Sequence, residues 1–427
     1  MLRAHWSALL FLSFAVTFLV GCSSSDPAVE EENEPPFVAT PEDIANSKAV
    51  AKSSNEFAVS LYQKLAANKS ENLFFSPYSI SSSLALISAG AEGETLAQMR
   101  SVLHLGMPEG ESLSGFHALA GLLRKDEQDG FTLNIANRIW TQRGLNLLPP
   151  FLKLVTANST EGISEVDFTA DPAAAAKTID AWITKETHGK ITGLLGPEAF
   201  NENTRLVLTN AVYFKAKWAE EFKPRNTQPA PFHRSPDREV QVPTMRQFGE
   251  RHIYAKTPDL EILDLPYSSG TASMVILLPS KRDGLAAVER QLSAESIDKW
   301  LASADYLPVN VFLPKFTFTS TFELNGVLSS LGMSQAFDLR KADFSRTSTE
   351  EPLFISAVAH KAFVDVNEEG TEAAAAIVVT ESKKEVDSRP TEFRADHPFL
   401  FLIRDRESGA ILFLGRVTDP TGGAKSE

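Results

Sequence analysis

The sequence predicts an α+β domain whose helices lie mostly in the first half of the chain and whose strands lie mostly in the second. Apolar residues recur with helical spacing around residues 53–65, 80–105 and 173–187. Runs rich in β-branched and aromatic residues, bounded by Pro, Gly, Asp or Ser, accumulate after residue 204. Because strands and helices do not alternate steadily, we expect largely antiparallel or mixed sheets rather than a doubly wound fold.

The individual elements follow in chain order. From Ser53, the residues Phe57, Leu61 and Leu65 recur every four positions, which predicts an amphipathic helix. The later alternating runs predict strands that are half buried or fully buried. These runs are Arg205–Trp218, Ser273–Pro279, Leu307–Phe318 and Ala410–Val417.

Residues 1–21 have the features of a secretory signal. Arg3 supplies a positive charge, and the following stretch from Ala8 to Val20 is almost wholly apolar. Such a stretch is short for a membrane-spanning helix, so we expect a cleaved signal, with an anchor helix that stays in place as the alternative. The segment ends in the sequence LVGC at Cys22, the single cysteine of the chain.

The LVGC sequence resembles a bacterial lipobox, which implies cleavage before Cys22 and acylation of that residue. Each buried methylene of a lipid chain contributes about 0.8 kcal/mol, so two or more chains hold a protein firmly on a bilayer. The resemblance therefore implies a lipid anchor on Cys22 and a place in the cell envelope. Ser23 follows the cysteine, which resembles the sorting choice of Gram-negative lipoproteins for the outer membrane or the extracellular face.

The remaining domain boundaries follow from composition. The segment Ser23–Asn46 is poor in large apolar residues and rich in Glu, Pro and Ser, so it cannot bury enough surface to become ordered. We therefore expect residues 22–47 to form the acylated cysteine and a disordered tether. The globular domain is expected over residues 48–420, followed by a tail at 421–427.

Charge and motifs argue against several classes of function. The formal net charge of -14 argues against nucleic acid as a partner, because phosphate binding needs a basic surface. The chain has no G-x-S-x-G, H-E-x-x-H, G-x-x-x-x-G-K-[ST] or G-x-G-x-x-G sequence. We expect neither an enzyme nor a metal or cofactor site, although a triad assembled only in space would leave no such motif.

Several segments together resemble one family, the serpins, over nearly the whole length from about Lys48 to Pro420. The likeness implies a serpin fold, in which helices surround a large central mixed sheet that accepts an inserting reactive-centre loop, with smaller sheets beside it. It also implies an inhibitor of serine peptidases, which we expect to be a monomer. The segments are NLFFSPYSISSSLALISAGAEGETLAQM (Asn72–Met99), WITKETHGKITGLL (Trp182–Leu195), LTNAVYFKAKW (Leu208–Trp218), LPKFTFTSTFEL (Leu313–Leu324), EEGTEAAAA (Glu368–Ala376) and FRADHPFLF (Phe393–Phe401).

The resemblance assigns roles to two groups of residues away from the loop. The first group, which we call the shutter, is a hydrogen-bonded cluster beneath the place where the main sheet opens. It comprises Ser76, Ser79, Asn210 and His360. The second group, which we call the breach, lies near the top of that sheet, where Lys315 and Glu368 pair beside Trp218; taken alone, Trp218 reads as an ordinary core residue.

The segment from Glu368 to Ala376 resembles the serpin hinge. Gly370 supplies backbone freedom where the loop folds back into the sheet. Counting alternately from Thr371, one face is small or apolar, while the other begins with Glu372. In isolation the alanine run favours a short surface helix. The inward face holds Thr371, Ala373, Ala375, Ile377 and Val379, and the hinge consists of Glu368, Gly370, Thr371, Glu372, Ala373, Ala374, Ala375 and Ala376.

The reactive-centre loop, about residues 368–392, is expected to be attacked between Lys384 and Glu385. Lys384 lies fourteen positions after Gly370, the usual place of the attacked residue in this family. Lys383 and Arg389 are rivals, and consecutive lysines suit a trypsin-like peptidase whose primary pocket holds a carboxylate.

The family mechanism implies a suicide substrate, in which loop cleavage forms an acyl-enzyme and the severed loop inserts as a new strand. Glu381 and Lys383 would then point inward near the end of that strand, where buried charges are costly, so either that end stays hydrated or the last residues insert inefficiently. The alternative is a non-inhibitory serpin that serves as a surface binding or structural protein. Such members tend to carry a charged or bulky residue at the position of Thr371 and to break the alanine run, and this chain does neither.

Overall fold

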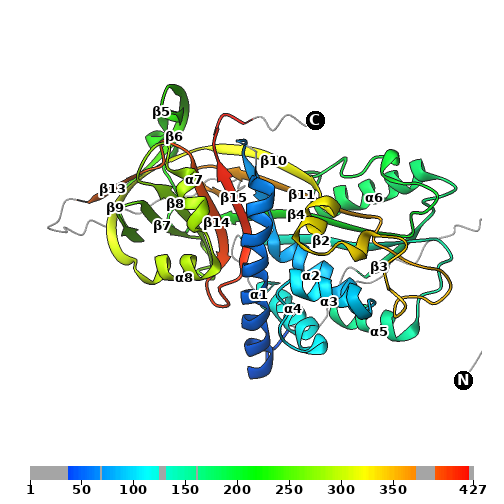
Figure 1. Ribbon diagram of the computed structural model, residues 1–427. Helices are drawn as coiled ribbons and strands as arrows, with labels where there is room; N and C mark the ends of the chain where they lie inside the picture. Colours follow the sequence, from blue (N-terminus) through cyan, green and yellow to red (C-terminus); the bar gives the residue numbers. More distant parts are fainter. Residues whose placement is uncertain (1–36, 68–69, 125–130, 160–161, 372–389, 423–427) are drawn as a thin grey trace, which may run out of the picture. The chain divides into compact units, whose positions relative to one another are not determined.

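Two β-sheets with helices packed on them make up the computed structural model (Figure 1). The structure describes residues 37–67, 70–124, 131–159, 162–371 and 390–422. The proposed lipidation site Cys22, the hinge residues from Glu372 to Ala376, and the predicted reactive bond between Lys384 and Glu385 lie outside these ranges. In the described part of the chain, most helices lie in the first half of the sequence and most strands lie in the second half. The α+β class is therefore confirmed.

The helices and short 3-10 turns have the following bounds. They are α1 (Pro41–Ala66), α2 (Pro77–Ser88), α3 (Gly93–Val102), α4 (Glu109–Arg124), α5 (Pro149–Asn158), α6 (Pro172–Glu186), η1 (Pro197–Ala199), η2 (Pro224–Asn226), α7 (Leu285–Gln291), α8 (Ala294–Ala302), α9 (Asn325–Leu331) and η3 (Gln335–Phe337). Within the residues described, none of these helices is both long enough and apolar enough to cross a bilayer.

The six-stranded sheet has the order β10-β11-β12-β4-β2-β3, and the nine-stranded sheet has the order β1-β15-β14-β8-β7-β6-β9-β13 with β5 paired to β6. Both sheets contain parallel and antiparallel pairs, as the sequence predicts. The strands are β1 (Leu73–Phe75), β2 (Phe131–Gln142), β3 (Ile163–Val166), β4 (Leu206–Lys217), β5 (Gln228–Ser235), β6 (Arg238–Lys256), β7 (Leu260–Pro266), β8 (Ala272–Pro279), β9 (Asp305–Pro314), β10 (Phe316–Glu323), β11 (Ala357–Val366), β12 (Gly370–Thr371), β13 (Thr391–Arg394), β14 (Phe399–Asp405) and β15 (Ile411–Val417).

Helix α1 begins at Pro41, earlier than residue 48, where the domain is expected to start. The Thr40 side chain accepts a hydrogen bond from the Asp43 N–H at 3.1 Å, and the Asp43 carboxylate accepts one from the Thr40 N–H at 2.9 Å. This capping box, with proline in the first turn, is a strong helix start. Residues 41–47 are therefore helical rather than part of the expected tether, because capping overrides the polar composition.

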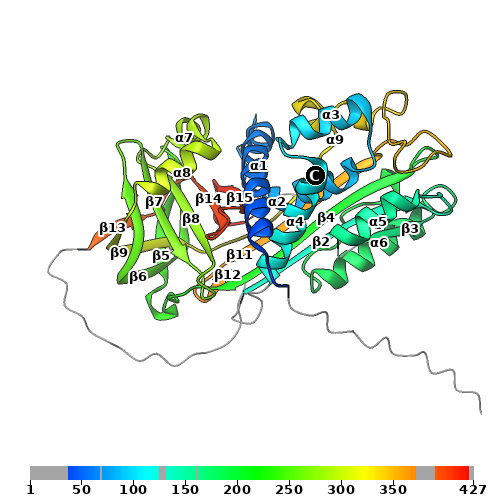
Figure 2. The same cartoon turned by 90° about the horizontal axis from the view of Figure 1, so that it is seen from below.

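Strand β4 lies in the middle of the six-stranded sheet and is buried on both faces. Leu206, Leu208 and Val212 belong to the larger core, whereas Val207 and Ala211 belong to a smaller core that includes apolar residues of α6. Figure 2 shows α6 on one side of β2 and β4 and α2 on the other. This double burial explains why the predicted strand Arg205–Trp218 reads as an apolar run with little polar alternation.

The predicted strand Leu307–Phe318 is wrong as a single element. It divides into β9 and β10, which belong to different sheets, and the chain changes sheet at Lys315. The Lys315 N–H donates to the Pro243 carbonyl oxygen at 2.9 Å. This short transition carries no glycine that would mark it, and it places the Lys315 side chain at the end of the six-stranded sheet.

Candidate functional site

Strand β12 lies between β4 and β11 at one end of the six-stranded sheet. Gly370 and Thr371 pair with β4, and Thr371 also pairs with Val366 of β11. The Thr371 side chain is directed inward, which is the side that alternation along the hinge assigns to it, and only 1% of the residue is exposed. Its hydroxyl lies 2.9 Å from the Tyr267 hydroxyl. The first residues of the hinge therefore already occupy strand positions in the sheet.

Gly370 is required by close backbone approach. A Cβ atom at this position would lie 2.0 Å from the Ala216 carbonyl oxygen and 2.7 Å from the Lys217 Cα. No side chain fits such a space unless the neighbouring strand moves. Glycine thus allows the hinge to enter the sheet beside β4.

Glu368 and Lys315, which the family resemblance pairs, form an ion pair next to β12. Lys315 Nζ donates to Glu368 Oε2 at 2.6 Å, and the Thr227 hydroxyl donates to Glu368 Oε1 at 2.7 Å. Burial alone would raise the pKa of Glu368, but the hydrogen bonds from Lys315 and Thr227 outweigh burial and hold the pKa below its ordinary value. The carboxylate is therefore charged and bound on both oxygens at neutral pH.

Trp218 donates hydrogen bonds from its backbone and from its side chain to residues at the start of the hinge. Its N–H donates to the Glu369 carbonyl oxygen at 2.9 Å, and its indole Nε1 donates to the Asn367 carbonyl oxygen at 2.9 Å. The indole stacks on Tyr267, with ring centroids 4.9 Å apart and planes 8° from parallel. Trp218 thus joins Lys315 and Glu368 at one site, where the breach residues are expected to meet.

Two of the shutter residues lie further along β4 and β11, where these two strands pair directly, and the other two, Ser76 and Ser79, lie at the start of α2. His360 of β11 and Asn210 of β4 are register partners in a parallel ladder. The Ser76 N–H donates to His360 Nε2 at 3.1 Å, so this nitrogen is an acceptor and the proton of the neutral ring sits on Nδ1. Burial lowers the pKa of His360 to about 3, which keeps the ring neutral. Ser76 also caps α2, donating its hydroxyl to Leu412 O at 2.7 Å and accepting the Ser79 N–H at 3.3 Å.

Asn137 of β2 belongs to the same cluster, although the sequence analysis missed it. It is the register partner of Asn210, and its Oδ1 accepts hydrogen bonds from the Ser79 hydroxyl at 2.6 Å and from Asn210 Nδ2 at 2.9 Å. Asn210 Nδ2 also donates to the Ser83 hydroxyl at 2.8 Å. The cluster therefore runs across β11, β4 and β2 onto α2. The strand-like run FTLNIANRIW holds two amides, Asn134 and Asn137, and nothing in it tells them apart.

These contacts define what must change if a strand enters between β4 and β11. The two strands pair through seven residue pairs, from Ala357 and Val207 to Phe363 and Tyr213. At the other end β12 already separates them. A longer strand in line with β12 would replace one parallel ladder with two antiparallel ladders, and it would part His360 from Asn210.

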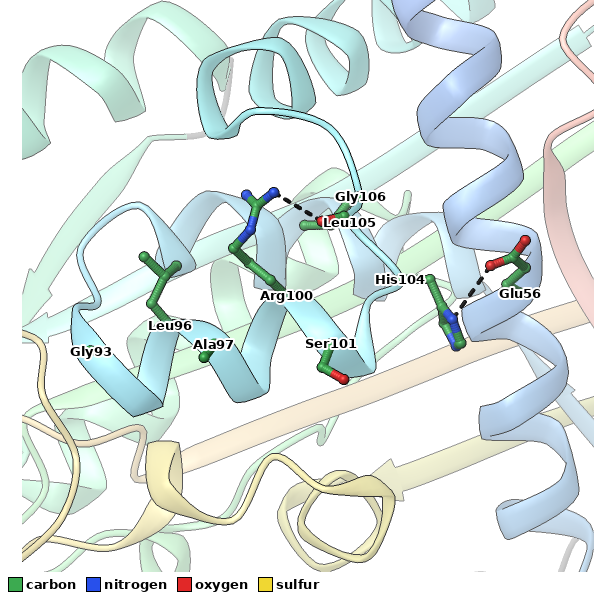
Figure 3. Close-up of a pocket in the computed structure, with 9 residues that line it drawn as sticks. All are labelled: Glu56, Gly93, Leu96, Ala97, Arg100, Ser101, His104, Leu105 and Gly106. Carbon is green, nitrogen blue, oxygen red and sulfur yellow. Dashed lines mark hydrogen bonds and ion pairs between the residues drawn. The ribbon is translucent and has the colours of Figure 1, made fainter.

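The surface also carries an open groove of about 680 Å³ between α1 and α3, drawn in Figure 3. His104 Nδ1 lies 3.4 Å from Glu56 Oε2, and His104 Nε2 lies 3.4 Å from the Ser60 hydroxyl. That hydroxyl donates to the Glu56 carbonyl oxygen at 3.0 Å. The serine proton is directed to its own helix and the ring is too far away to remove it, so this set is not an activated nucleophile.

Three comparisons place the chain among known proteins. The family model described as "Serpin (serine protease inhibitor)" matches residues 52–420. An uncharacterized serpin-like protein of Thermococcus kodakarensis is 41% identical over 378 residues, covering 88% of this chain and 87% of that protein. The leukocyte elastase inhibitor of Bos taurus is 42% identical over 378 residues, covering 85% and 97% of the two chains.

Solved structures agree with the fold. The crystal structure of uncleaved ovalbumin matches with a TM-score of 0.81 and 30% identity, covering 87% of this chain and 100% of ovalbumin. The helices, the large mixed sheet and the second sheet are thus those of the serpin fold. The family is described as one of serine protease inhibitors rather than enzymes, and the Bos taurus relative is named as an inhibitor. The chain belongs to the serpin family.

Proposed function

We propose that this chain inhibits serine endopeptidases as a suicide substrate. A peptidase attacks the reactive-centre loop, its serine forms an acyl bond to the new carboxyl end, and the severed loop inserts between β4 and β11. Insertion carries the attached peptidase along the sheet and distorts its active site before water can hydrolyse the acyl bond. Loop insertion therefore has to be faster than hydrolysis.

This proposal rests on the position of Thr371 in the six-stranded sheet. The residue is buried between β4 and β11, while both strands still pair directly beyond it. Insertion thus needs no new entry point, because each further residue extends an existing short strand. A threonine fits here, since its small side chain shares a hydroxyl contact with Tyr267, whereas a long or charged side chain would have to be buried at a cost.

We further propose that the attacked bond joins Lys384 and Glu385 and that the target is trypsin-like. A lysine side chain suits a pocket that holds a carboxylate, and Lys383 precedes Lys384. Arg389 is followed by Pro390, whose ring makes that bond a poor substrate. Mass spectrometry of the peptide released from a denatured trypsin complex tests the assignment. A new N-terminus at Glu385 supports it, and one at Lys384, Pro390 or within Val378–Ser382 refutes it.

Lipid anchoring on Cys22 would place this inhibitor on the outer membrane or on the extracellular face of the cell envelope. Helix α1 begins at Pro41, so the segment Ser23–Thr40 would be the whole connection. Eighteen extended residues span at most roughly 60 Å. The inhibitor would then act close to the bilayer as a monomer and intercept peptidases that approach the cell surface.

Incubation with trypsin followed by boiling in detergent tests the inhibitory function. The proposal predicts a complex whose mass equals the sum of both partners less the released peptide. Cleavage of the loop without any such complex would favour the alternative, a non-inhibitory serpin with a surface binding or structural role. Cleaved inhibitor should also melt tens of degrees higher than intact inhibitor, an order-of-magnitude expectation from roughly ten added strand hydrogen bonds at about 0.5–1.5 kcal/mol each.

A further inference from the structure

A cavity of about 270 Å³ lies where β6 and β7 separate, next to residues that hold the hinge. The ladder between these strands ends at the pair Ile253 and Asp264. Beyond it β6 continues beside β9, and β7 continues beside β8, so the backbones leave space between them. A cavity of about 150 Å³ already accepts benzene, so this one has room for a substituted ring.

Buried aromatic and aliphatic side chains form much of the cavity wall. Trp218, Phe222 and Leu265 line the cavity, and each is at most 3% exposed. Tyr306 lines it from the outside and is 59% exposed. Walls of this kind favour a flat ring, which gains both apolar contact and ring-to-ring packing.

His252 supplies a buried hydrogen-bond acceptor at this cavity. The Gln247 amide nitrogen donates to the Glu220 carbonyl oxygen at 2.8 Å, which leaves the amide oxygen for His252 Nε2 at 2.7 Å. Nε2 therefore carries the ring proton, and burial lowers the pKa of His252 to about 4, so the ring is neutral at pH 7. Its Nδ1 is then an acceptor, and no described residue donates to it.

Asp264 supplies a second buried acceptor on the same lining. Only 4% of the residue is exposed, and its Oδ1 has no hydrogen-bond partner among the residues that the structure describes. Burial raises the pKa of Asp264, and the nearby Ser273 hydroxyl and Arg406 offset this rise only in part. An unpaired buried polar group costs about 1–3 kcal/mol. Two such acceptors on one cavity would be satisfied by a ligand that donates a hydrogen bond.

Charged side chains line the exposed side of the cavity. Arg251, Arg406 and Glu220 line the cavity and are exposed. The Arg251 guanidinium lies over the Tyr306 ring, 4.9 Å from its centroid, which keeps the cation beside the opening. Arg406 faces the buried Asp264 carboxylate electrostatically, whereas Arg251 lies at the opening, so a ligand whose outer end is a carboxylate fits the guanidinium geometry there.

We propose that this cavity binds a small hydroxyaryl carboxylate. Its ring packs against Trp218, its hydroxyl donates to His252 Nδ1 inside, and its carboxylate meets Arg251 at the opening. The occupant would touch residues that hold the hinge, because the Trp218 N–H donates to Glu369 O at 2.9 Å and the Phe222 N–H donates to Glu368 O at 2.8 Å. Binding would therefore stabilise the hinge in its present position, whether or not the chain inhibits a peptidase.

Isothermal titration calorimetry of the full chain tests the ligand class with three matched probes. We expect 4-hydroxyphenylacetate to bind at least tenfold more tightly than phenylacetate, which lacks the donor, and than 4-hydroxyphenylethanol, which lacks the anion. Equal affinity for the three probes, or no binding of 4-hydroxyphenylacetate at millimolar concentration, would overturn the proposal and leave a water-filled cavity.

Variants then locate the site. His252→Leu should weaken binding of 4-hydroxyphenylacetate at least tenfold, whereas His104→Leu in the α1–α3 groove should leave binding unchanged. Arg251→Gln, an exposed substitution that should not disturb folding, should abolish the preference for the carboxylate probe over the alcohol. Binding should also slow hydrogen exchange at the amides of Trp218 and Phe222. Unchanged exchange, or full affinity in both His252→Leu and Arg251→Gln, would contradict the assignment.

Discussion

His360 of β11 and Asn210 of β4 face each other in register, both fully buried, at the point where an inserting strand would have to pass between them. The His360 Nδ1 proton and the Asn210 Oδ1 acceptor are complementary, yet neither atom has a hydrogen-bond partner among the described residues. The sheet is therefore closed here by the backbone ladder between β4 and β11 and by packing, while Ser76 and Asn137 bind the two side chains separately. Among the residues described, no bond between these two side chains joins β4 to β11. Such a junction opens at a lower cost than a fully bonded one.

The first prediction concerns acid sensitivity at His360. Its folded pKa is about 3 against an ordinary value of 6.5, so the unfolded chain binds the extra proton and stability falls as pH drops below about 6.5, by about 1.4 kcal/mol per pH unit. His360→Gln offers the Ser76 N–H a neutral acceptor that does not titrate. The loss of melting temperature between pH 7.5 and 5 should thus be about 2–3 °C smaller in this variant.

The matched control is His104→Gln, which makes the same substitution at a histidine that lies outside the cluster. Thermal unfolding followed by circular dichroism at pH 7.5, 6.5 and 5 compares the three proteins. If His360→Gln lost as much melting temperature as the wild type over this range, His360 would not be the titrating group.

The second prediction concerns Asn137, which joins α2 to β4. Asn137→Leu removes the acceptor of the Ser79 hydroxyl and one of the two acceptors of Asn210 Nδ2. We expect a loss of about 1–2 kcal/mol of stability, because buried polar groups lose partners. Asn203→Leu on the surface should stay within about 0.5 kcal/mol of the wild type. Equal chemical-denaturation midpoints for both variants would show that the Asn137 hydrogen bonds contribute nothing.

The third prediction concerns Lys315 and Glu368. The Lys315 side chain is 38% exposed, so solvent screening limits the pair to at most about 1 kcal/mol. Because the folded pKa of Glu368 lies below its ordinary value of 4.5, this contribution is present above that value and is lost as pH falls through the folded pKa. Lys315→Met should lower the melting temperature at pH 7, and its difference from the wild type should shrink as the pH falls below 4.5, whereas Lys299→Met, at an exposed pair, should have little effect across this range. A pH-independent difference for Lys315→Met would argue for lost packing instead.

The fourth prediction concerns attachment to the membrane. Cys22→Ala should move the protein from the membrane fraction to the soluble fraction, because the residue proposed to carry the lipid is removed, while Ser23→Ala should remain in the membrane fraction. Fractionation of cells that express each variant, followed by immunoblotting, measures the partition. Unchanged partition of Cys22→Ala would refute the lipid anchor.

Much of the fold could be predicted from local patterns. The Arg205–Trp218 run predicts β4 because both faces of this strand are buried, and the early spacing of Phe57, Leu61 and Leu65 predicts α1. The start of α1 was missed, since two side chains at Thr40 and Asp43 decide it rather than hydrophobic periodicity. The change of sheet at Lys315 was also missed, because apolar residues continue on both sides and only distant partners separate β9 from β10.

The site could be predicted only in part. The roles of Ser76, Asn210 and His360 came from the family resemblance, since nothing local distinguishes a buried histidine in a strand from any other. Asn137 shows the limit of such reasoning: its amide becomes part of the cluster only because β2 pairs with β4 in one register. Pairing between segments far apart in sequence depends on packing and not on local residue pattern.

The direct test of loop insertion compares Thr371→Arg with Thr371→Ser. Thr371 is 1% exposed between β4 and β11, so arginine would bring an unpaired charge into the sheet, whereas serine keeps a small hydroxyl beside Tyr267. Mixed with trypsin and boiled in detergent, wild type and Thr371→Ser should give the covalent complex, while Thr371→Arg should be cleaved at the same bond and released. An equal yield of complex from Thr371→Arg would contradict insertion through β12 as the inhibitory step.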